Sequence, residues 1–384
     1  MRRNSSSLSV GAPSSVRAVD GRLPFVRPEP GILAAEGGTG TGPALRLALA
    51  SLQTQADELQ RLAAAVRDAA ATAGSTAAGS TTADLAGLVA EAAMRTVPRW
   101  HFAMLNDHER NLAFEVALER CLPPDAHVLD IGSGTGLLAM MAVRAGATRV
   151  TTCEANPLLA EIATQVVAAH GMSDLITVVP KRSDQLRIGV DLATPADLVV
   201  SEIVDCGLIG EGLFPTMRHA REHLLARGGR LLPESVRLFG FLIESDVVDG
   251  LNRVATAGGF DVRLINALAT RGHFPVRLST WPHRVLSETV EFAEFDLLAD
   301  PLADGARRRT LPVTAGGTAH ALVVWFEMNI GGGVRVRNSP DNVGSHWMQA
   351  FVPLRHPVPV AGGDAFDCEL RWCDRRLSVA VSSR

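Results

Sequence analysis

Two carboxylates, Glu202 and Glu211, stand nine residues apart in the stretch 202–212, EIVDCGLIGEG. The apolar run just before them, 197–201, is expected to form a buried strand. Because open α/β sheets bind ligands at the carboxyl ends of their strands, both acids are candidates for binding or catalysis. Paired acids in a loop can also be surface charge or a metal site, although magnesium would require further carboxylates nearby.

A glycine-rich loop is the second candidate, in the stretch 128–138, VLDIGSGTGLL. Its apolar start predicts a buried parallel strand, and apolar residues recur at helical spacing after the loop until Gly146. Glycines without side chains let the backbone bend tightly and press against a ligand. The three loop glycines are Gly132, Gly134 and Gly136.

The next predicted strand, 150–153, ends at Glu154, about 20 residues beyond the loop, where an acid can accept hydrogen bonds from both ribose hydroxyls. With Asp130 just before the glycines, this spacing resembles the S-adenosylmethionine fingerprint more than the dinucleotide one. S-adenosylmethionine has no phosphate, so it does not need a helix N-terminus that faces a pyrophosphate. A purely structural glycine loop is the alternative.

Composition bounds the class of protein. With 384 residues, 47% of them hydrophobic and 20% charged, the chain has room for two or three globular domains. A net charge of -4 gives no support for nucleic-acid binding, and no apolar run reaches the roughly 18 residues of a membrane span. Five scattered cysteines without metal-ligand spacing favour a reduced, cytoplasmic protein. We therefore expect no metal, no membrane and no nucleic-acid partner.

The chain divides into four predicted regions. Residues 1–42 are rich in Ser, Gly and Pro, which predicts a disordered tail. The region 43–92 is expected to be helical, with an apolar seam repeating every seven residues that serves either self-association or packing on the next domain. Alternating strand and helix patterns predict a Rossmann-like α/β domain at 93–233, and alternating β-rich segments predict an antiparallel β-barrel or sandwich at 234–384.

The segment 100–121 is amphipathic, and its part FAMLNDHERN resembles the N-terminal helix of the protein arginine methyltransferases. The resemblance implies that Arg110 pairs with the methionine carboxylate of S-adenosylmethionine and that Met104 lies close to the sulfonium. It also implies that Asp107 supports a histidine from late in the chain. Ordinary solvated charges on a helix are the alternative reading.

Three further stretches resemble the same family, in the family's order. EIVDCGLIGEG is similar to its double-glutamate loop, in detail to that of the branch that adds one methyl group. GGFDVRLINAL, within about 247–269, resembles the dimerisation arm, although its apolar face can instead be local core. Ser345-His346-Trp347 stands where the family has Thr-His-Trp. The resemblance covers residue 93 to the C-terminus.

The resemblance also implies site roles. Two carboxylates can grip a planar guanidinium bidentately, leave the attacking nitrogen with more lone-pair character and accept the proton that transfer releases. Glu202 and Glu211 would do this, with Asp205 narrowing the pocket or contacting substrate. The remaining implied roles are closure of the pocket by His346 with Asp107, a flat wall from Trp347, and adenine contacts from Ser183 and Asp184.

We therefore expect a cytoplasmic, homodimeric S-adenosylmethionine-dependent arginine methyltransferase. It would transfer one methyl group to free L-arginine, giving Nω-monomethyl-L-arginine and S-adenosylhomocysteine. A single lysine and no tyrosine indicate a GC-rich genome, and the sequence is similar to the free-arginine methyltransferases of nitrosourea antibiotic pathways. The alternatives are an arginine in a protein or peptide as acceptor, another amine as acceptor, and a catalytically silent scaffold.

Overall fold

The computed structural model describes residues 96–373 and 375–381, together with Gln60, Ala64, Ala90, Ala93 and Met94. The chain divides into two units, Met1–Leu85 and Ala86–Arg384, and the two long described ranges belong to the second. The predicted tail at 1–42 and almost all of the predicted helical region 43–92 lie outside the described residues.

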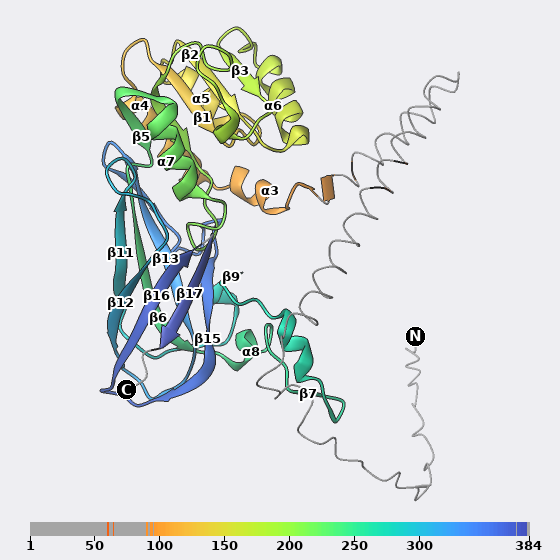
Figure 1. Ribbon diagram of the computed structural model, residues 1–384, viewed down its shortest axis with the longest axis vertical. Coiled ribbons are helices and arrows are strands. Elements are labelled where there is room, and N and C mark those ends of the chain that lie inside the picture. The colour runs from red at the N-terminus through yellow and green to blue at the C-terminus, as the bar shows by residue number, and fades with distance from the viewer. Residues whose placement is uncertain are drawn as a thin grey trace, which may run out of the picture. The chain divides into compact units, whose positions relative to one another are not determined.

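A five-stranded parallel sheet follows the order β3-β2-β1-β4-β5 (Figure 1). Its strands are β1 (His127–Ile131), β2 (Arg149–Cys153), β3 (Ile176–Val179), β4 (Ala196–Ser201) and β5 (Leu225–Leu232). The connecting elements are α5 (Leu137–Arg144), α6 (Pro157–Ala169), η1 (Ser183–Gln185) and α7 (Leu213–His223). Every residue of β1 is buried, as in a parallel strand covered on both faces. The predicted Rossmann-like fold is confirmed.

The strand order reverses between β1 and β4, and it is there that an open α/β sheet leaves a crevice at its carboxyl edge. The glycine loop follows β1, and Glu202 follows β4. These two neighbouring strands therefore deliver both predicted motifs to the same edge.

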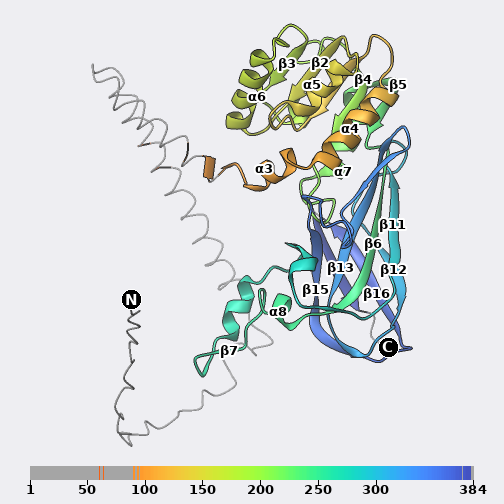
Figure 2. The same ribbon diagram turned by 180° about the vertical axis from the view of Figure 1, so that it is seen from behind.

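The amphipathic segment 100–121 is two helices, α3 (Trp100–Leu105) and α4 (His108–Cys121). Asp107 is the N-cap of α4, since its Oδ1 accepts a hydrogen bond from the backbone N–H of Arg110 at 2.9 Å. α4 lies between the parallel sheet and the rest of the described chain, in contact with β13 and β14 (Figure 2).

Residues 235–381 form antiparallel sheets, which confirms the second half of the predicted fold class. The larger sheet has the order β10-β6-β13-β15-β9, with β11 paired to β6 and β14 to β13, and the smaller has the order β12-β16-β17. Contacts of β11 with β12 and of β15 with β17 join them. The bounds are β6 (Ser235–Glu244), β9 (Phe274–Val276), β10 (Arg284–Val285), β11 (Val290–Asp296), β12 (Gly305–Pro312), β13 (Gly317–Gly331), β14 (Val334–Arg337), β15 (Gln349–Val360), β16 (Ala365–Cys373) and β17 (Arg376–Val381); the 3-10 turn η3 (Leu278–Thr280) follows β9.

The segment 245–273, between β6 and β9, contains only short elements and projects from the sheets in Figure 1. They are α8 (Asp246–Asp249), β7 (Thr256–Ala257), β8 (Phe260–Asp261) and η2 (Arg263–Leu268). The segment exposes large apolar side chains, namely Val247, Leu251, Phe260, Leu264, Ile265 and Leu268. We call it the arm; it contains the stretch 247–269 predicted as a dimerisation arm. Among the described residues, no helix is both long enough and apolar enough to cross a membrane.

Candidate active site

A cavity of about 350 Å³ opens at the carboxyl edge of β1, β2 and β4. It brings together eight of the residues that the sequence singled out: Met104, Arg110, Gly132, Gly134, Glu154, Ser183, Glu202 and Glu211. Trp100, His101 and Leu105 from the α3 helix also line it, as do Thr216 of α7 and Arg375 from the far end of the chain.

Glu154 fixes the glycine loop from the end of β2. Its Oε2 accepts a hydrogen bond from the backbone N–H of Gly134 at 3.0 Å, and its Oε1 accepts one from the N–H of Asn156 at 2.8 Å. The φ of Gly132 is +90°, and a side chain there would lie 2.8 Å from Cγ2 of Ile203. A residue with a Cβ would be strained at Gly132 and would displace the start of the loop that carries the glutamates.

Asp130 lies behind the loop and does not line the cavity. It is fully buried, and its Oδ2 accepts a hydrogen bond from Thr152 at 2.7 Å, while Thr152 in turn pairs with Ser133. Burial raises the pKa of the Asp130 carboxyl to about 6, although the Thr152 bond lowers it. In this structure Asp130 supports the loop through other side chains.

Arg110 and Glu202 pair with each other, Nη2 to Oε2, at 2.6 Å, with 4% of each side chain exposed. Nη1 of Arg110 donates to Asn111, whereas the buried Nε has no hydrogen-bond partner among the described residues. A buried donor without an acceptor is costly, so this atom is suited to a ligand carboxylate. The sequence had assigned Arg110 and Glu202 to different ligands and did not foresee their ion pair.

Glu211 lines the same cavity as a second, differently tuned carboxyl group. Burial, followed by the nearby charges of Glu202, Asp205 and Glu154, raises its pKa from 4.5 to about 8. Near neutral pH it therefore holds a proton when no cation is bound. A cationic ligand between the two glutamates would favour release of that proton.

Asp107 and His346 meet, as the resemblance implied. Oδ2 of Asp107 lies 2.9 Å from Nδ1 of His346 and accepts a hydrogen bond from the backbone N–H of His346 at 2.8 Å. Although burial alone would raise the pKa of Asp107, hydrogen bonds from His346 and from the N–H of Arg110 lower it to about 2. The pair joins the start of α4, which carries Arg110, to the loop before β15.

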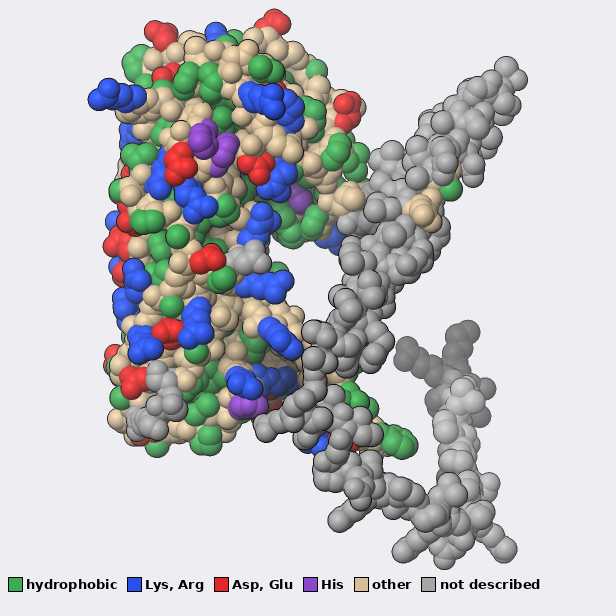
Figure 3. All heavy atoms as spheres, viewed as in Figure 1, with side chains coloured by type: hydrophobic (Ala, Val, Ile, Leu, Met, Phe, Trp, Pro, Cys, Tyr) green, Lys and Arg blue, Asp and Glu red, His purple; other side chains and the backbone are tan. Residues whose placement is uncertain are grey.

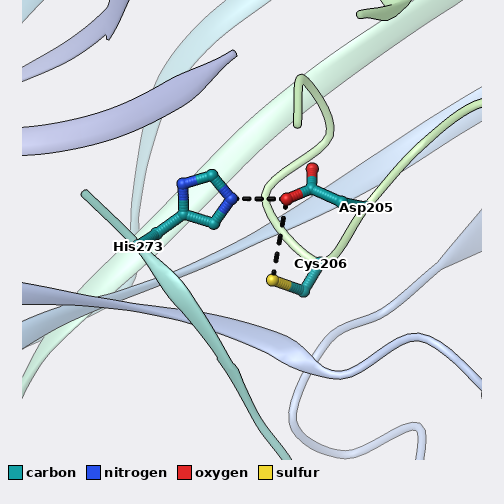
Figure 4. Close-up of side chains that lie close together, drawn as sticks. All are labelled: Asp205, Cys206 and His273. Atoms are coloured by element: carbon teal, nitrogen blue, oxygen red, sulfur yellow. Dashed lines mark hydrogen bonds and ion pairs between the residues drawn. The ribbon is translucent and has the colours of Figure 1, made fainter. Parts of the chain in front are cut away.

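Asp205 does not line the main cavity but a neighbouring one, where it pairs with His273 (Figure 4). Its Oδ2 lies 2.5 Å from Nε2 of His273, and its Oδ1 accepts hydrogen bonds from the N–H groups of Gly207 and Gly210 at 3.2 and 2.7 Å. A side chain at Gly207 would strike the His273 ring at 2.7 Å. Asp205 therefore holds the double-glutamate loop in shape, and His273 holds Asp205.

His273 is a site residue that sequence reasoning missed. The signal was weak, because an isolated histidine at the start of a short strand, 68 residues from its partner, belongs to no motif. The one signal in the sequence was the carboxylate of Asp205 within the loop, which a hydrogen-bond donor would stabilise.

Asp205, Cys206 and His273 bring three possible metal-ligating atoms within 4.8 Å of one another. However, Nδ1 of His273 accepts a hydrogen bond from the backbone N–H of Leu377 at 3.0 Å, which places the ring proton on Nε2. The Nε2 lone pair is then not free to bind a metal ion, and burial raises the pKa of the Cys206 thiol well above its usual range. The cluster therefore stabilises the double-glutamate loop through hydrogen bonds and is not a metal site.

Other predicted site residues lie outside the main cavity. Trp347 is buried, donates from Nε1 to the carbonyl of Val204 at 3.2 Å, and packs edge-on against Phe326. It therefore supports the loop from inside. Asp184 pairs with Arg182 at the surface, and Gly136, with φ +81°, starts α5. Their proposed ligand contacts stay predictions.

Comparison with known proteins adds to this geometry. Residues 238–381 match the arginine methyltransferase oligomerization subdomain, and residues 111–216 match the ribosomal protein L11 methyltransferase family. The chain is 56% identical to the arginine N(omega)-methyltransferase of Streptomyces achromogenes subsp. streptozoticus over 340 residues, covering 88% of this chain and 93% of that protein. The chain belongs to the arginine N-methyltransferase family. It is accordingly an S-adenosylmethionine-dependent arginine N-methyltransferase, as predicted.

More distant members of the family also match. The protein arginine N-methyltransferase 7 of Aedes aegypti is 33% identical over 70% of this chain and 47% of its own length, so the chain spans about half of that relative. Two solved structures share the fold. They are the Trypanosoma brucei PRMT1 enzyme-prozyme complex with AdoHcy (TM-score 0.62, 23% identity, 71% of this chain and 86% of that one) and Arabidopsis thaliana protein arginine methyltransferase 10 (TM-score 0.57, 19% identity, 70% and 86%).

Proposed function

We propose that this methyltransferase transfers one methyl group to free L-arginine, giving Nω-monomethyl-L-arginine, in the biosynthesis of a natural product. The observation that carries the proposal is that Glu202 and Glu211 line one cavity together with the glycine loop and Glu154. The name of the Streptomyces relative supports arginine Nω as the acceptor atom.

The residues present fit S-adenosylmethionine, which when bound supplies an electrophilic methyl group on a sulfonium. Arg110 would offer its unpaired Nε to the methionine carboxylate. Glu154 would bind the ribose hydroxyls with the lone pairs that its two backbone hydrogen bonds leave, and Ser183 would contact the adenine. Met104, buried in the cavity wall, would cover the sulfonium.

The two glutamates would clamp the acceptor guanidinium. Glu202 lies in an ion pair with Arg110, whereas the pKa of Glu211 is about 8, so Glu211 would lose its proton as the cation enters. Their paired charge draws positive charge onto two guanidino nitrogens and leaves lone-pair character on the third. Attack of this nitrogen on the methyl group of bound S-adenosylmethionine would form the nitrogen–methyl bond and leave the electron pair of the sulfur–methyl bond on sulfur. The proton released by the nitrogen would pass to Glu211, whose buried surroundings favour the protonated form once the charge of the guanidinium is lost.

The acceptor is tested by incubating the full chain with labelled S-adenosylmethionine and either free L-arginine or an arginine-rich peptide. Mass spectrometry should show monomethylated L-arginine as the main product. Turnover of the peptide alone would instead establish a protein substrate, and cofactor binding without transfer to any guanidine would support a silent scaffold. Turnover of another amine, unaffected by Gln at 202 or 211, would remove the role proposed for the glutamates.

We further propose a cytoplasmic homodimer in which the arm forms the interface. The oligomerization subdomain match includes the arm, and hydrophobic side chains gather at its tip at the lower right of Figure 3. The five cysteines are free, which fits a reducing compartment. Sedimentation of the wild type and of Leu264→Glu, a charge placed in the exposed apolar face, tests the assembly: the variant should be monomeric, and an unchanged dimer would place the interface elsewhere.

A further inference from the structure

Arg375 reaches the active site from the last hairpin of the chain. It lies in the turn that joins β16 to β17 and lines the main cavity together with Glu202 and Glu211. A side chain at Gly212, the residue after Glu211, would lie 3.1 to 3.2 Å from Nε, Cζ and Nη2 of Arg375. The guanidinium of Arg375 therefore rests against the backbone of the double-glutamate loop.

In the described part of the chain, no side chain holds this guanidinium. Arg375 is exposed, and none of the described residues forms an ion pair or a side-chain hydrogen bond with it. Two arginines on the strands of the same sheet differ, since Arg308 and Arg371 both pair with Glu369. A positive charge beside an acidic cavity, with no counter-ion among the described side chains, is available to an anion.

The backbone at Arg375 departs from local preference. Its φ is +64°, in the left-handed region that glycine and asparagine adopt far more readily than arginine. Strained backbone of this kind gathers at binding sites, and here the strain directs a long cationic side chain toward the cavity. A glycine would satisfy the turn better but would offer no charge.

Basic side chains continue beyond Arg375. The neighbouring cavity is lined by Arg375 together with Arg271 and Arg376. The cleft thus has an acidic floor, suited to a guanidinium, and a basic rim. Free L-arginine places its charges in a matching order, since three methylene groups and the α-carbon, which carries the α-ammonium, separate its cationic guanidino group from the α-carboxylate.

We propose that Arg375 binds the α-carboxylate of free L-arginine and thereby selects the free amino acid over an internal arginine residue. This rests on the proposed function, because an internal arginine has no α-carboxylate to bind. A peptide rich in arginine would also bring positive charge toward the rim formed by Arg271, Arg375 and Arg376. A peptide ending in arginine offers the same carboxylate, so the test includes one.

The test compares four acceptors on the full-length enzyme: L-arginine, L-argininamide and agmatine, which lack the carboxylate, and a dipeptide with C-terminal arginine. We expect Arg375→Gln to raise KM for L-arginine by about tenfold to one-hundredfold, the range of a charged hydrogen bond, with kcat within about threefold. KM for agmatine and for L-argininamide should already be high and should not change. If the enzyme recognises only the carboxylate, the KM for the dipeptide should respond to Arg375→Gln as the KM for L-arginine does. If the dipeptide is not turned over, the pocket also excludes a residue attached to the α-amino group of the acceptor arginine.

Two variants separate binding from folding. Arg375→Gly removes the charge but relieves the backbone, so it should raise KM as Gln does without lowering Tm. Arg335→Gln, at an exposed arginine on β14 whose side chain pairs with Glu327, is the charge-matched control and should leave KM unchanged.

The outcomes separate the two proposals. If the wild type methylates L-arginine and Arg375→Gln has the same KM, or raises KM for agmatine equally, Arg375 does not bind the carboxylate and the proposed function stands. If the wild type methylates only peptides, the proposed function itself fails. If Arg375→Gly raises KM only in step with a lower Tm, the residue is structural and the inference is overturned.

Discussion

The two halves of the cleft are held together over very different sequence distances. On the cofactor side, Glu154 bonds to the N–H groups of Gly134 and Asn156, which are 20 and 2 residues away. On the acceptor side, the double-glutamate loop is held from the antiparallel sheets. The partners are His273 to Asp205, Asn338 to the carbonyl of Cys206 and Trp347 to the carbonyl of Val204, 68, 132 and 143 residues apart.

The difference indicates that the two domains stabilise different parts of the cleft. The parallel sheet can form the glycine loop and the Glu154 contacts from its own strands and loops, whereas the shape of the double-glutamate loop depends on the antiparallel sheets. Changes in the second domain that loosen the double-glutamate loop should therefore reduce methyl transfer without reducing cofactor binding.

The largest effect is expected from the glutamates themselves. Glu211→Gln keeps the size of the side chain but removes both the clamp charge and the proton acceptor, so kcat/KM should fall by about 10³-fold. The Kd for S-adenosylhomocysteine, measured by calorimetry, should change less than about threefold. Glu115→Gln, at a half-buried glutamate of α4 that pairs with Arg144 of α5, is the matched control. Activity within tenfold of wild type would mean that Glu211 does not contact the acceptor.

Glu202→Gln tests the contrast between the cofactor side and the acceptor side, because Glu202 belongs to the double-glutamate loop and also pairs with Arg110 on the cofactor side. Its loss leaves the buried Arg110 without a counter-ion, so this variant should weaken both cofactor binding and transfer. Equal cofactor affinity in the Glu202 and Glu211 variants would show that the Arg110 pair is not maintained when the cofactor is bound.

The reverse pattern is expected at Glu154. Replacement by Gln removes a charged acceptor of two backbone hydrogen bonds and of the ribose hydroxyls, so the Kd for S-adenosylhomocysteine should rise by about tenfold to one-hundredfold. At saturating S-adenosylmethionine, kcat and the KM for L-arginine should stay close to wild type. Glu161→Gln, on the exposed face of α6, controls for the charge change. A drop in kcat at saturation would break the proposed separation of the two sides.

The same contrast explains what could be predicted from sequence. The glycine loop, Glu154 and the strands around them follow one another within about 30 residues, so periodicity and glycine chemistry were sufficient there. The family resemblance paired Asp107 with His346, which are 239 residues apart, and no spacing rule would have done so.

Other parts of the site could not be predicted because they depend on packing. The Asp205–His273 pair and the position of Arg375 arise only when the antiparallel sheets dock beside the loop. The amphipathic segment 100–121 divides into two helices at Asp107 because its side chain accepts a hydrogen bond from the N–H of Arg110 at the start of α4, which amphipathic spacing does not reveal. The strand β12, which is mostly exposed and carries three consecutive arginines, lacks the apolar alternation that marks its neighbours.

A smaller effect is expected at His273, which acts on the acceptor side through Asp205. His273→Leu removes the hydrogen bond to the Asp205 carboxylate, so kcat/KM for L-arginine should fall by about tenfold, with S-adenosylhomocysteine affinity unchanged. His273→Gln retains an N–H donor at a similar reach and should recover most of the loss. If Leu and Gln reduce activity equally, the ring's packing against Gly207, and not its hydrogen bond, is what positions the loop.

The smallest effect is a pH dependence of stability at Glu211. Its pKa is about 8 in the folded protein against an ordinary 4.5, so the folded chain keeps a proton that the unfolded chain releases between these values. The stability that this carboxyl contributes is full below about pH 4.5 and is lost as the pH rises through 8. Glu211→Gln cannot ionise, so its Tm without ligands should exceed that of the wild type by at least about 3 °C at pH 9 and match it at pH 5. Parallel Tm curves for the two proteins would mean that Glu211 titrates normally, and a proton acceptor poised near neutral pH would have to be sought elsewhere on the acceptor side.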